Sequence, residues 1–338
     1  MFRCIQLAKL AAGNVAPNPM VGAVMVSDGR IIGEGYHMKF GEPHAEVNCI
    51  NDVDPLNHHL ISSSTLYVSL EPCSHHGKTP PCANLIIKNN IPKVVIGCRD
   101  PFKEVNGNGI QKLLEAGIEV VENVLERECR DFNKRFFTYH IQQRPYIILK
   151  WAQSIDNKIA GTNFEKISIS NDITNRQVHK WRSEEASILV GANTALHDNP
   201  SLTNRLWKGN NPVRLVIDPN LRLPLTLEIF DRKVKTIVFN CSVNRDEPNL
   251  MHIKLDQHSF LPSLLHHLYS LHIQSVLIEG GAKLLQSFID AGLWDEVRII
   301  VNTELTIGSG KQAPVLTDFS QVKQERYLAD IITYYKKL

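Results

Sequence analysis

His44-Ala45-Glu46, together with Cys73 and Cys82 further along, is the part of the sequence that decides how the first half of the chain folds and what it can do. A histidine and two cysteines give Zn²⁺ three protein ligands and leave the fourth tetrahedral position for water, which is the arrangement of a catalytic zinc site. Zinc in such a site makes hydroxide accessible near neutral pH. Glu46 lies too close to His44 in the sequence for both side chains to bind one ion comfortably, so we interpret Glu46 as the acid/base residue.

The order of these residues matches the signature H-x-E followed by P-C-x-x-C, which is typical of zinc-dependent nucleobase deaminases. The match departs in one place, because eight residues, Ser74 to Pro81, separate the two cysteines where the signature has two. A structural zinc site would need a fourth protein ligand, and His37, His75 or His76 could supply it. The neighbouring Glu46 favours the catalytic interpretation.

The first half of the chain resembles the deaminase domain of the bifunctional riboflavin-biosynthesis deaminase/reductase. Besides His44-Ala45-Glu46, the residues that carry this resemblance are Pro17-Asn18-Pro19-Met20-Val21-Gly22 and Glu71-Pro72-Cys73-Ser74-His75-His76-Gly77-Lys78-Thr79-Pro80-Pro81-Cys82. The resemblance extends over nearly the whole chain. It implies that the amide of Asn18 binds substrate, whereas Pro-Asn-Pro by itself would also suit a simple turn.

The composition is that of a soluble globular protein with two domains. The chain has 338 residues, of which 43% are hydrophobic and 21% charged. A net charge of +2 gives no field that favours a nucleic-acid backbone or an acidic membrane. No apolar run is long enough to span a bilayer, and the first ten residues do not form a signal peptide, so we expect a cytoplasmic protein. Seven irregularly spaced cysteines speak against a disulfide framework.

Alternating strands and helices predict a layered α/β domain in the first half. The expected elements are a hairpin with strands at 21–26 and 31–36, helices at 44–50, 82–88 and 110–115, and strands at 65–70, 94–97 and 118–121. Two helix starts and one strand end thereby converge on the zinc ligands. We set the first domain at residues 1–124 and a polar linker at 125–144.

A second alternation of strands and helices fills residues 145–338, which we set as the second domain. Strands are expected at 146–151, 188–190, 213–217, 236–239 and 275–278, and helices at 175–182, 260–271 and 282–289. Several motifs here resemble the reductase domain of the same bifunctional family: Lys150-Trp151-Ala152-Gln153-Ser154-Ile155-Asp156-Asn157-Lys158-Ile159-Ala160, His179 to Arg182, Val190 to Thr194, Asp198 to Arg205 and Glu279-Gly280-Gly281. The resemblance implies an N-terminal cytidine-deaminase-like three-layer α/β/α domain and a C-terminal dihydrofolate-reductase-like α/β domain.

The resemblance also implies the residues of the reductase site. Residues expected to line an NADP(H) site are Gln153, Ser168, Thr194, Asp198, Gly281, Ala282, Lys283, Leu284, Leu285, Gln286 and Ser287, and those expected to hold the substrate are Arg182, Leu202, Arg205 and Glu279. An arginine suits a phosphate because its planar fork can donate two parallel hydrogen bonds, although Arg182 would also suit a solvated helix face. A glycine pair after a strand lets backbone approach a pyrophosphate, or simply forms a strand-to-helix turn. Many relatives carry Trp-Ile-Thr where this chain has Ser168-Ile169-Ser170.

The function implied by the resemblance is a pair of consecutive steps in riboflavin synthesis. A diaminopyrimidinone that carries a phosphoribosylamino group is deaminated with zinc, and its ribosyl chain is then reduced to ribityl with NADPH. The expected partners are these small molecules and further copies of the chain, with no nucleic acid and no membrane.

Two alternatives belong to other classes of protein. A deaminase of tRNA or single-stranded DNA would call for a basic stripe with aromatic residues, and 7% aromatics with a net charge of +2 leave little room for one. A non-catalytic, zinc-stabilised nucleotide-binding protein would have no need of Glu46.

Overall fold

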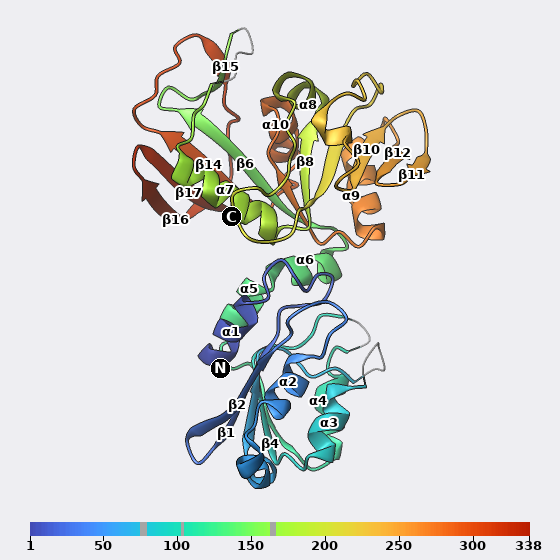
Figure 1. Cartoon of the computed structure of the whole chain (residues 1–338), viewed down its shortest axis with the longest axis vertical. Helices are drawn as coiled ribbons and strands as arrows, with labels where there is room; N and C mark the ends of the chain where they lie inside the picture. Colours follow the sequence, from blue (N-terminus) through green and yellow to red (C-terminus); the bar gives the residue numbers. More distant parts are fainter. Residues whose placement is uncertain (75–79, 103–104, 163–166) are drawn as a thin grey trace. The chain divides into compact units, whose positions relative to one another are not determined.

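The computed structural model describes residues 1–74, 80–102, 105–162 and 167–338, which form two compact units, Met1–Gln143 and Arg144–Leu338 (Figure 1). Each unit has its own sheet and its own hydrophobic core. Within the described ranges, none of the helices combines the length and the apolar character needed to cross a membrane.

The sheet of the first unit has five described strands in the order β2-β1-β3-β4-β5. Their bounds are Gly22–Ser27 (β1), Arg30–Tyr36 (β2), Thr65–Val68 (β3), Lys93–Ile96 (β4) and Glu119–Val121 (β5). β1 pairs antiparallel with β2 and β3, whereas β3, β4 and β5 run parallel. The strands that run parallel end at one edge of the sheet, and the segment with Cys73 leaves β3 at that edge.

Helices cover both faces of this sheet. The helices α2 (Ala45–Asn51), α3 (Cys82–Lys88) and α4 (Asn108–Glu115) pack with Met25 and Leu66, while α1 (Phe2–Lys9) packs with Val24, which points to the opposite face. The 3₁₀-helix η1 (Pro55–Ser63) precedes β3. This arrangement confirms the three-layer α/β/α fold expected of the first half.

Two helices occupy the segment 125–144 that the sequence analysis set apart as a linker. They are α5 (Glu126–Phe132) and α6 (Lys134–Gln142). Cys129, Phe136 and Phe137 are buried in a cluster with Leu70, a residue of the first unit. The charged residues that made this segment look like a linker lie on the outer faces of the two helices, so most of the segment packs as part of the first unit.

The main sheet of the second unit has ten described strands in the order β11-β12-β10-β9-β8-β13-β6-β14-β17-β16. Their bounds are Tyr146–Ser154 (β6), Ser187–Gly191 (β8), Val213–Ile217 (β9), Thr236–Asn240 (β10), Arg245–Glu247 (β11), Leu250–Lys254 (β12), Ser275–Ile278 (β13), Glu296–Asn302 (β14), Phe319–Tyr327 (β16) and Asp330–Lys337 (β17). A separate sheet pairs β7 (Lys158–Gly161) with β15 (Gly310–Gln312).

The strands from β12 to β14 in this order run parallel and are covered by helices on both faces. The helices α9 (Phe260–Ser270) and α10 (Ala282–Asp290) pack against Ile147 and Leu149, whereas α7 (Asp172–Glu184) packs against Tyr146 and Ile148. The short helix α8 (Ala192–Asp198) follows β8, and the 3₁₀-helix η2 (Glu228–Phe230) packs into the same cluster as α8. The predicted α/β fold is thus confirmed in the second half as well.

Parallel pairing brings the carboxyl ends of β6, β8 and β13 to one edge of the sheet. Ligands of open α/β sheets bind at such an edge, where the strand order reverses. The residues that follow β8 and β13, which are the start of α8 and the segment Glu279-Gly280-Gly281, are therefore placed for binding.

Candidate active sites

The three side chains predicted to bind zinc lie together in the first unit. His44 precedes α2, Cys73 lies beyond the end of β3, and Cys82 is the first residue of α3. The sulfur atoms of Cys73 and Cys82 lie 3.6 and 3.4 Å from Nδ1 of His44, and the three ligand atoms are all within 4.8 Å of one another. One nitrogen and two sulfur donors at this spacing suit Zn²⁺. The donor set therefore fits the predicted metal.

Glycines in β2 allow α2, and with it His44, to lie directly on the sheet. A Cβ atom at Gly35 would lie 2.2 Å from the backbone nitrogen of Cys49 and 2.5 Å from the carbonyl oxygen of Ala45. A Cβ atom at Gly33 would lie 2.5 Å from the carbonyl oxygen of Cys49. Only glycine has room at these positions, so the place of His44 follows from contact of backbone with backbone.

Hydrogen bonds and burial tune the acid–base groups of this cluster. The pKa of Cys73 is lowered, first by a hydrogen bond from the thiol of Cys82 and then by one from His44, and the backbone N–H of Cys82 also donates to Sγ of Cys73 at 3.3 Å. These bonds favour the thiolate, which is the form that binds metal. Glu46 is only 3% exposed, and burial raises the pKa of its carboxyl group, an effect that the neighbouring Cys73 reinforces. A raised pKa suits a carboxyl group that must accept a proton and then return it.

His37 links the side chain of Asn18 to the cluster of zinc ligands. Nδ2 of Asn18 lies 3.1 Å from Nε2 of His37, and Nδ1 of His37 lies 3.1 Å from the carbonyl oxygen of Pro43. A carbonyl only accepts, so Nδ1 of His37 donates to Pro43 and Nε2 accepts from Asn18. Burial lowers the pKa of His37, which favours this neutral form. Both ring nitrogens are engaged, so His37 is not the fourth ligand of a structural zinc site; His75 and His76 lie outside the described residues.

Glu71 fixes the segment that carries Cys73. Its carboxylate is buried and accepts hydrogen bonds from the backbone N–H groups of Gly107 and Gly109, each at 3.0 Å, and of Asp100 and Ile110, at 3.3 and 3.4 Å. A carboxylate at the start of a helix is stabilised by the free N–H groups there. The N-terminus of α4 is thereby tied to the residue two positions before a metal ligand.

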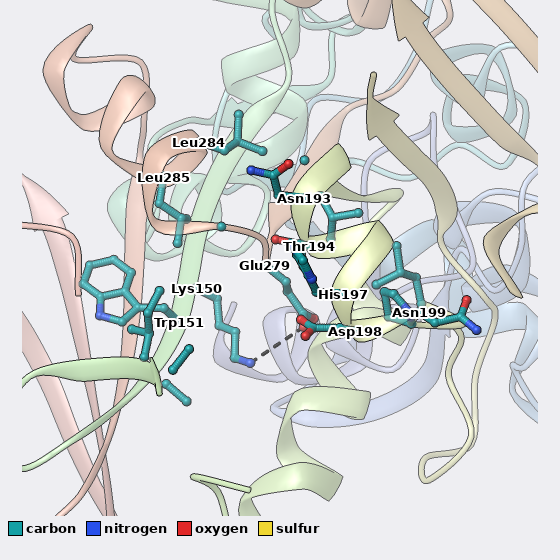
Figure 2. Close-up of a pocket in the computed structure, with 18 of the residues that line it drawn as sticks. Lys150, Trp151, Asn193, Thr194, His197, Asp198, Asn199, Glu279, Leu284 and Leu285 are labelled. Carbon is teal, nitrogen blue, oxygen red and sulfur yellow. Dashed lines mark ion pairs between the residues drawn. The ribbon is translucent and has the colours of Figure 1, made fainter. Parts of the chain in front are cut away.

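A cavity of about 1100 Å³ lies in the second unit at the carboxyl ends of β6, β8 and β13. The start of α8, the start of α10 and one side of α7 contribute to its walls. Figure 2 shows Lys150 of β6 and Glu279 pointing toward one another. It also shows Asn193 and Thr194, which belong to the start of α8, and Leu284, which belongs to the start of α10. The volume of the cavity is slightly above the roughly 300–1,000 Å³ that is typical of small-molecule and cofactor sites.

Three charged side chains form the centre of this cavity. Nε and Nη2 of Arg182 each donate to a different carboxylate oxygen of Glu279 at 2.8 Å, and Nζ of Lys150 lies 3.7 Å from the same carboxylate. Burial alone would raise the pKa of Glu279, but the charges of Arg182 and Lys150 and the hydrogen bonds from Arg182 outweigh it and lower the pKa to about 2. Burial lowers the pKa of Lys150, and Glu279 opposes that shift. Glu279 is therefore ionised and held between two cations.

His179 holds the loop that carries Arg205. Nδ1 of His179 accepts hydrogen bonds from the backbone N–H groups of Arg205 at 2.9 Å and Leu206 at 3.4 Å. Burial and the charges of Arg182 and Arg205 lower the pKa of His179 to about 4, so its ring is neutral near pH 7 and can accept. The guanidinium of Arg205 stays exposed, with Nη1 3.3 Å from Oγ1 of Thr203.

Comparison with known proteins assigns each half of the chain to a protein family. Residues 1–98 match the family model of the cytidine and deoxycytidylate deaminase zinc-binding region, and residues 145–333 match the RibD C-terminal domain. The chain is 38% identical over 316 residues to riboflavin biosynthesis protein RibD of Aquifex aeolicus, with 92% of this chain and 87% of that protein covered. It is 37% identical over 330 residues to RibD of Actinobacillus pleuropneumoniae, with 93% and 86% covered.

A solved structure gives the same assignment. The crystal structure of a diaminohydroxyphosphoribosylaminopyrimidine deaminase/5-amino-6-(5-phosphoribosylamino)uracil reductase from Thermotoga maritima matches with a TM-score of 0.92 at 39% sequence identity, covering 100% of this chain and 97% of that one. The chain belongs to the RibD family. Its first unit is a zinc-dependent deaminase domain and its second unit an NADPH-dependent reductase domain of riboflavin biosynthesis. The predicted family, bifunctional enzyme class and cofactors are confirmed.

Most residues predicted for the reductase site of this RibD protein do line the cavity. They are Ser168, Thr194, Asp198, Gly281, Lys283, Leu284 and Leu285 on the expected cofactor side, and Arg182, Leu202, Arg205 and Glu279 on the expected substrate side. Arg182 is not a solvated helix residue, because Glu279 occupies two of its donors.

Four other residues predicted to contact the cofactor do not belong to the described lining of the cavity: Gln153, Ala282, Gln286 and Ser287. The amide of Gln153 accepts from Nε1 of Trp151 and donates to Oδ1 of Asn157, both at 2.7 Å. Gln286 and Ser287 lie on the second turn of α10 and bond to residues of that helix and to Val315. Only the first turn of α10 borders the cavity.

Several cavity residues were not singled out from the sequence. Lys150 and His179 stand inside the quoted motifs without an assigned role, and Asn193 and Arg222 also line the cavity. A lysine within the otherwise apolar strand at 146–151 is the one signal that could have pointed to a site. Arg222 follows a strand by five residues, and only the folded loop brings it to the cavity.

Proposed function

We propose that this RibD protein deaminates 2,5-diamino-6-(5-phosphoribosylamino)pyrimidin-4(3H)-one and then reduces the ribosyl chain of the product, giving 5-amino-6-(5-phosphoribitylamino)uracil. The observation that carries the proposal is the cluster of His44, Cys73 and Cys82 beside the buried Glu46, in a chain whose second unit holds a cavity of cofactor size. The description of the Thermotoga maritima protein as a deaminase and reductase of such pyrimidines supports the choice of substrate.

In the deaminase site, His44, Cys73 and Cys82 hold the zinc ion. When bound, zinc supplies Lewis-acid activation of the water that replaces the amino group. Glu46 accepts a proton from this water and delivers it to the departing nitrogen, so that ammonia leaves. The buried position of Glu46 keeps bulk water from exchanging that proton. Asn18 binds the pyrimidine through its side-chain amide, and the hydrogen bond to His37 sets its orientation.

In the reductase site, the charged centre orients the sugar and Arg205 binds the phosphate. Lys150 and Glu279 present one cation and one carboxylate to the cavity, and Arg182 serves mainly to hold Glu279, because two of its donors are used for that purpose. Arg205 keeps an exposed guanidinium whose backbone is fixed by His179. Leu202 adds an apolar wall.

The cofactor side of the cavity is formed by Ser168, Thr194, Asp198 and the first turn of α10, from Gly281 to Leu285. NADPH supplies the hydride, and the protein places it against the sugar carbon. Arg222 lines the cavity, where its Nη2 donates to Oδ1 of Asn193, and no ion pair found among the described residues joins Arg222 to a carboxylate. An uncompensated guanidinium in this cavity suits the 2′-phosphate that distinguishes NADPH from NADH.

Mass spectrometry of the products separates this proposal from the alternatives. The purified protein is incubated with the diaminopyrimidinone phosphate, first without and then with NADPH. We expect replacement of one amino group by oxygen in the first reaction and the further gain of two hydrogens in the second. An unchanged substrate in both reactions would leave a non-catalytic zinc protein. Deamination of single-stranded DNA or tRNA in a parallel incubation, with the pyrimidine left unchanged, would favour the nucleic-acid deaminase.

The domain limits, the assembly and the location of the protein also belong to this proposal. We assign deamination to residues 1–124 with the following segment 125–144, and reduction to residues 145–338. A homo-oligomer in the cytoplasm is consistent with a small-molecule enzyme, and sedimentation analysis with cell fractionation tests both points.

A further inference from the structure

Asn133 makes two hydrogen bonds to the backbone of one distant residue, Met20. The N–H of Met20 donates to Oδ1 of Asn133 at 2.9 Å, and Nδ2 of Asn133 donates to the carbonyl oxygen of Met20 at 2.8 Å. Asn133 is only 3% exposed. A buried side-chain amide that satisfies both backbone groups of one residue fixes that residue in position and in rotation.

Met20 ends the Pro17-Asn18-Pro19 loop, which leads into β1. Asn18 within this loop donates its backbone N–H to the carbonyl oxygen of Val15 at 2.8 Å and its side-chain amide to His37 at 3.1 Å. The ring of His37 lies edge-on to the ring of the zinc ligand His44, with centroids 5.3 Å apart. A continuous set of contacts thus runs from Asn133 through the loop to the metal cluster.

Asn133 is itself held rigidly at the junction of α5 and α6. Its N–H donates to the carbonyl oxygen of Arg130 at 3.1 Å, and its carbonyl oxygen accepts from the N–H of Phe137 at 3.0 Å. Phe137 is buried against the core of the first unit, and the guanidinium of Arg130 stacks 4.5 Å from its ring. Each polar atom of Asn133 therefore has a partner, and the amide meets Met20 from a fixed base.

We propose that Asn133 is a positioning residue of the deaminase, which holds the loop of Asn18 so that the Asn18 amide meets the pyrimidine. The inference rests on the substrate-binding role of Asn18 in the proposed function. It places a requirement for deamination in segment 125–144, which the sequence indicates only as a linker and which packs mostly as part of the first unit. Loss of the Asn133 amide frees Met20 and lets the Asn18 amide rotate away from the substrate.

A double-mutant cycle on the full-length zinc enzyme tests whether Asn133 acts through Asn18. The variants are Asn133→Ala, Asn18→Ala and the double variant, each assayed for deamination, zinc affinity against a chelating dye, and reduction of pre-deaminated substrate. Removing a side chain that satisfies buried backbone groups should lower deaminase kcat/KM by about tenfold or more, mainly through KM. Zinc affinity and reduction should not change. Because the two residues act as a unit, the double variant should be no worse than Asn18→Ala.

Two further variants keep the test decisive. Asn89→Ala removes a similar amide, which donates to the carbonyl oxygen of Leu85 at the end of α3, and should leave the deaminase KM unchanged. Asn133→Asp preserves the side-chain volume and the acceptor for the Met20 N–H but repels the Met20 carbonyl; it should show an intermediate KM even if Asn133→Ala does not fold. Additive effects in the cycle, or an unchanged KM in both Asn133 variants, would overturn the proposal. An unchanged KM in Asn18→Ala would instead refute the role of Asn18 in the proposed function.

Discussion

Arg182 and Glu279 form a two-pronged ion pair in the reductase cavity, with Nε and Nη2 of the guanidinium each 2.8 Å from a different carboxylate oxygen. The guanidinium also donates from Nη1 to the carbonyl oxygen of Thr203 at 3.3 Å. Both side chains are largely buried, at 14% and 7% exposed. The planar edge of Arg182 that would match a phosphate is thus already occupied by a carboxylate, and Arg205, whose guanidinium is exposed, is the arginine that we propose for the substrate phosphate.

The first prediction concerns the stability of the second unit. Arg182→Ala leaves the buried Glu279 with only the more distant Lys150 as a cationic partner. Removing one partner of a buried ion pair lowers the free energy of unfolding by about 3–5 kcal/mol. All four tryptophans of the chain, Trp151, Trp181, Trp207 and Trp294, lie in this unit. Urea unfolding followed by tryptophan fluorescence therefore reports on it selectively, and the midpoint should fall.

The matched control for this prediction is Arg245→Ala. Arg245 is 63% exposed and lies 3.5 Å from Glu247, so its pair should contribute less than about 1 kcal/mol. Equal shifts in the two variants would contradict the buried ion pair.

The second prediction concerns acid stability. The folded-state pKa of Glu279 is lowered to about 2, whereas an unfolded glutamate titrates at about 4.3. A lowered pKa means that the stabilisation is fully present above the unfolded pKa and is lost as the pH falls toward 2, with a total on the order of 3 kcal/mol. The difference in unfolding free energy between the wild type and Glu279→Gln should therefore shrink between pH 5 and pH 2. A difference that is constant over this range would show that Glu279 is not ionised in the folded protein.

The third prediction separates the two activities. Glu46→Gln keeps all three zinc ligands but removes the group that moves the proton, so deamination should fall by about 10²-fold or more while bound zinc and reduction of pre-deaminated substrate stay unchanged. Cys82→Ala should lose zinc as well, because one of three ligands is removed. Metal analysis and separate assays of the two steps check both results. Full zinc occupancy in Cys82→Ala would refute the ligand assignment.

The fourth prediction concerns Arg205. If its exposed guanidinium binds the substrate phosphate, Arg205→Ala removes a charge-assisted hydrogen bond of roughly 1.5–3 kcal/mol, which lowers reductase kcat/KM by about 10- to 150-fold. Arg205→Lys should recover only part of this loss, because a point charge does not reproduce the planar fork. Steady-state reduction of pre-deaminated substrate gives the answer, and deamination serves as the internal control. A change of less than about threefold would leave Arg205 as a solvated loop residue.

The fifth prediction concerns the choice of cofactor. Arg222→Ala should raise the Kd for NADP⁺ by about tenfold or more, because a charge-assisted bond to the 2′-phosphate is lost, and should leave the Kd for NAD⁺ nearly unchanged. Calorimetric titration of the reductase site with 2′,5′-ADP and 5′-AMP, which differ only in the 2′-phosphate, gives a second measurement that needs no turnover. Equal weakening of both ligands would place Arg222 at another part of the cofactor.

The fold was predictable from the sequence where hydrophobic patterns were simple. The strand at Ser275–Ile278 and the helix that starts at Ala282 have the predicted limits within one residue. No element was assigned beyond Ile289, although β14, β16 and β17 follow. In β14 the buried Glu296 and Arg298 hide the pattern, because they compensate each other at 2.7 Å. The edge strand β16 is exposed along most of its length and has no alternation to detect.

The site was predictable where chemistry demanded particular residue types at short spacing. A histidine and two cysteines have few roles in common besides metal binding, so His44, Cys73 and Cys82 were found without the fold. The roles of Arg182 and Gln153 depend on which neighbour each side chain meets after folding. The partners of these residues, Glu279 and Trp151, are set by strand order and by rotamers, neither of which a local pattern specifies.

The glycines of β2 have a consequence for how enzymes of this architecture can diversify. Because the backbone of α2 rests on Gly33 and Gly35, the metal ligand at the start of α2 is located by the sheet and not by the length of the connection that precedes it. Residues 38–42 of that connection are exposed. Insertions and deletions there can alter the surroundings of the deaminase site while the metal keeps its place, whereas a single methyl group added at Gly35 would displace the helix and end deamination.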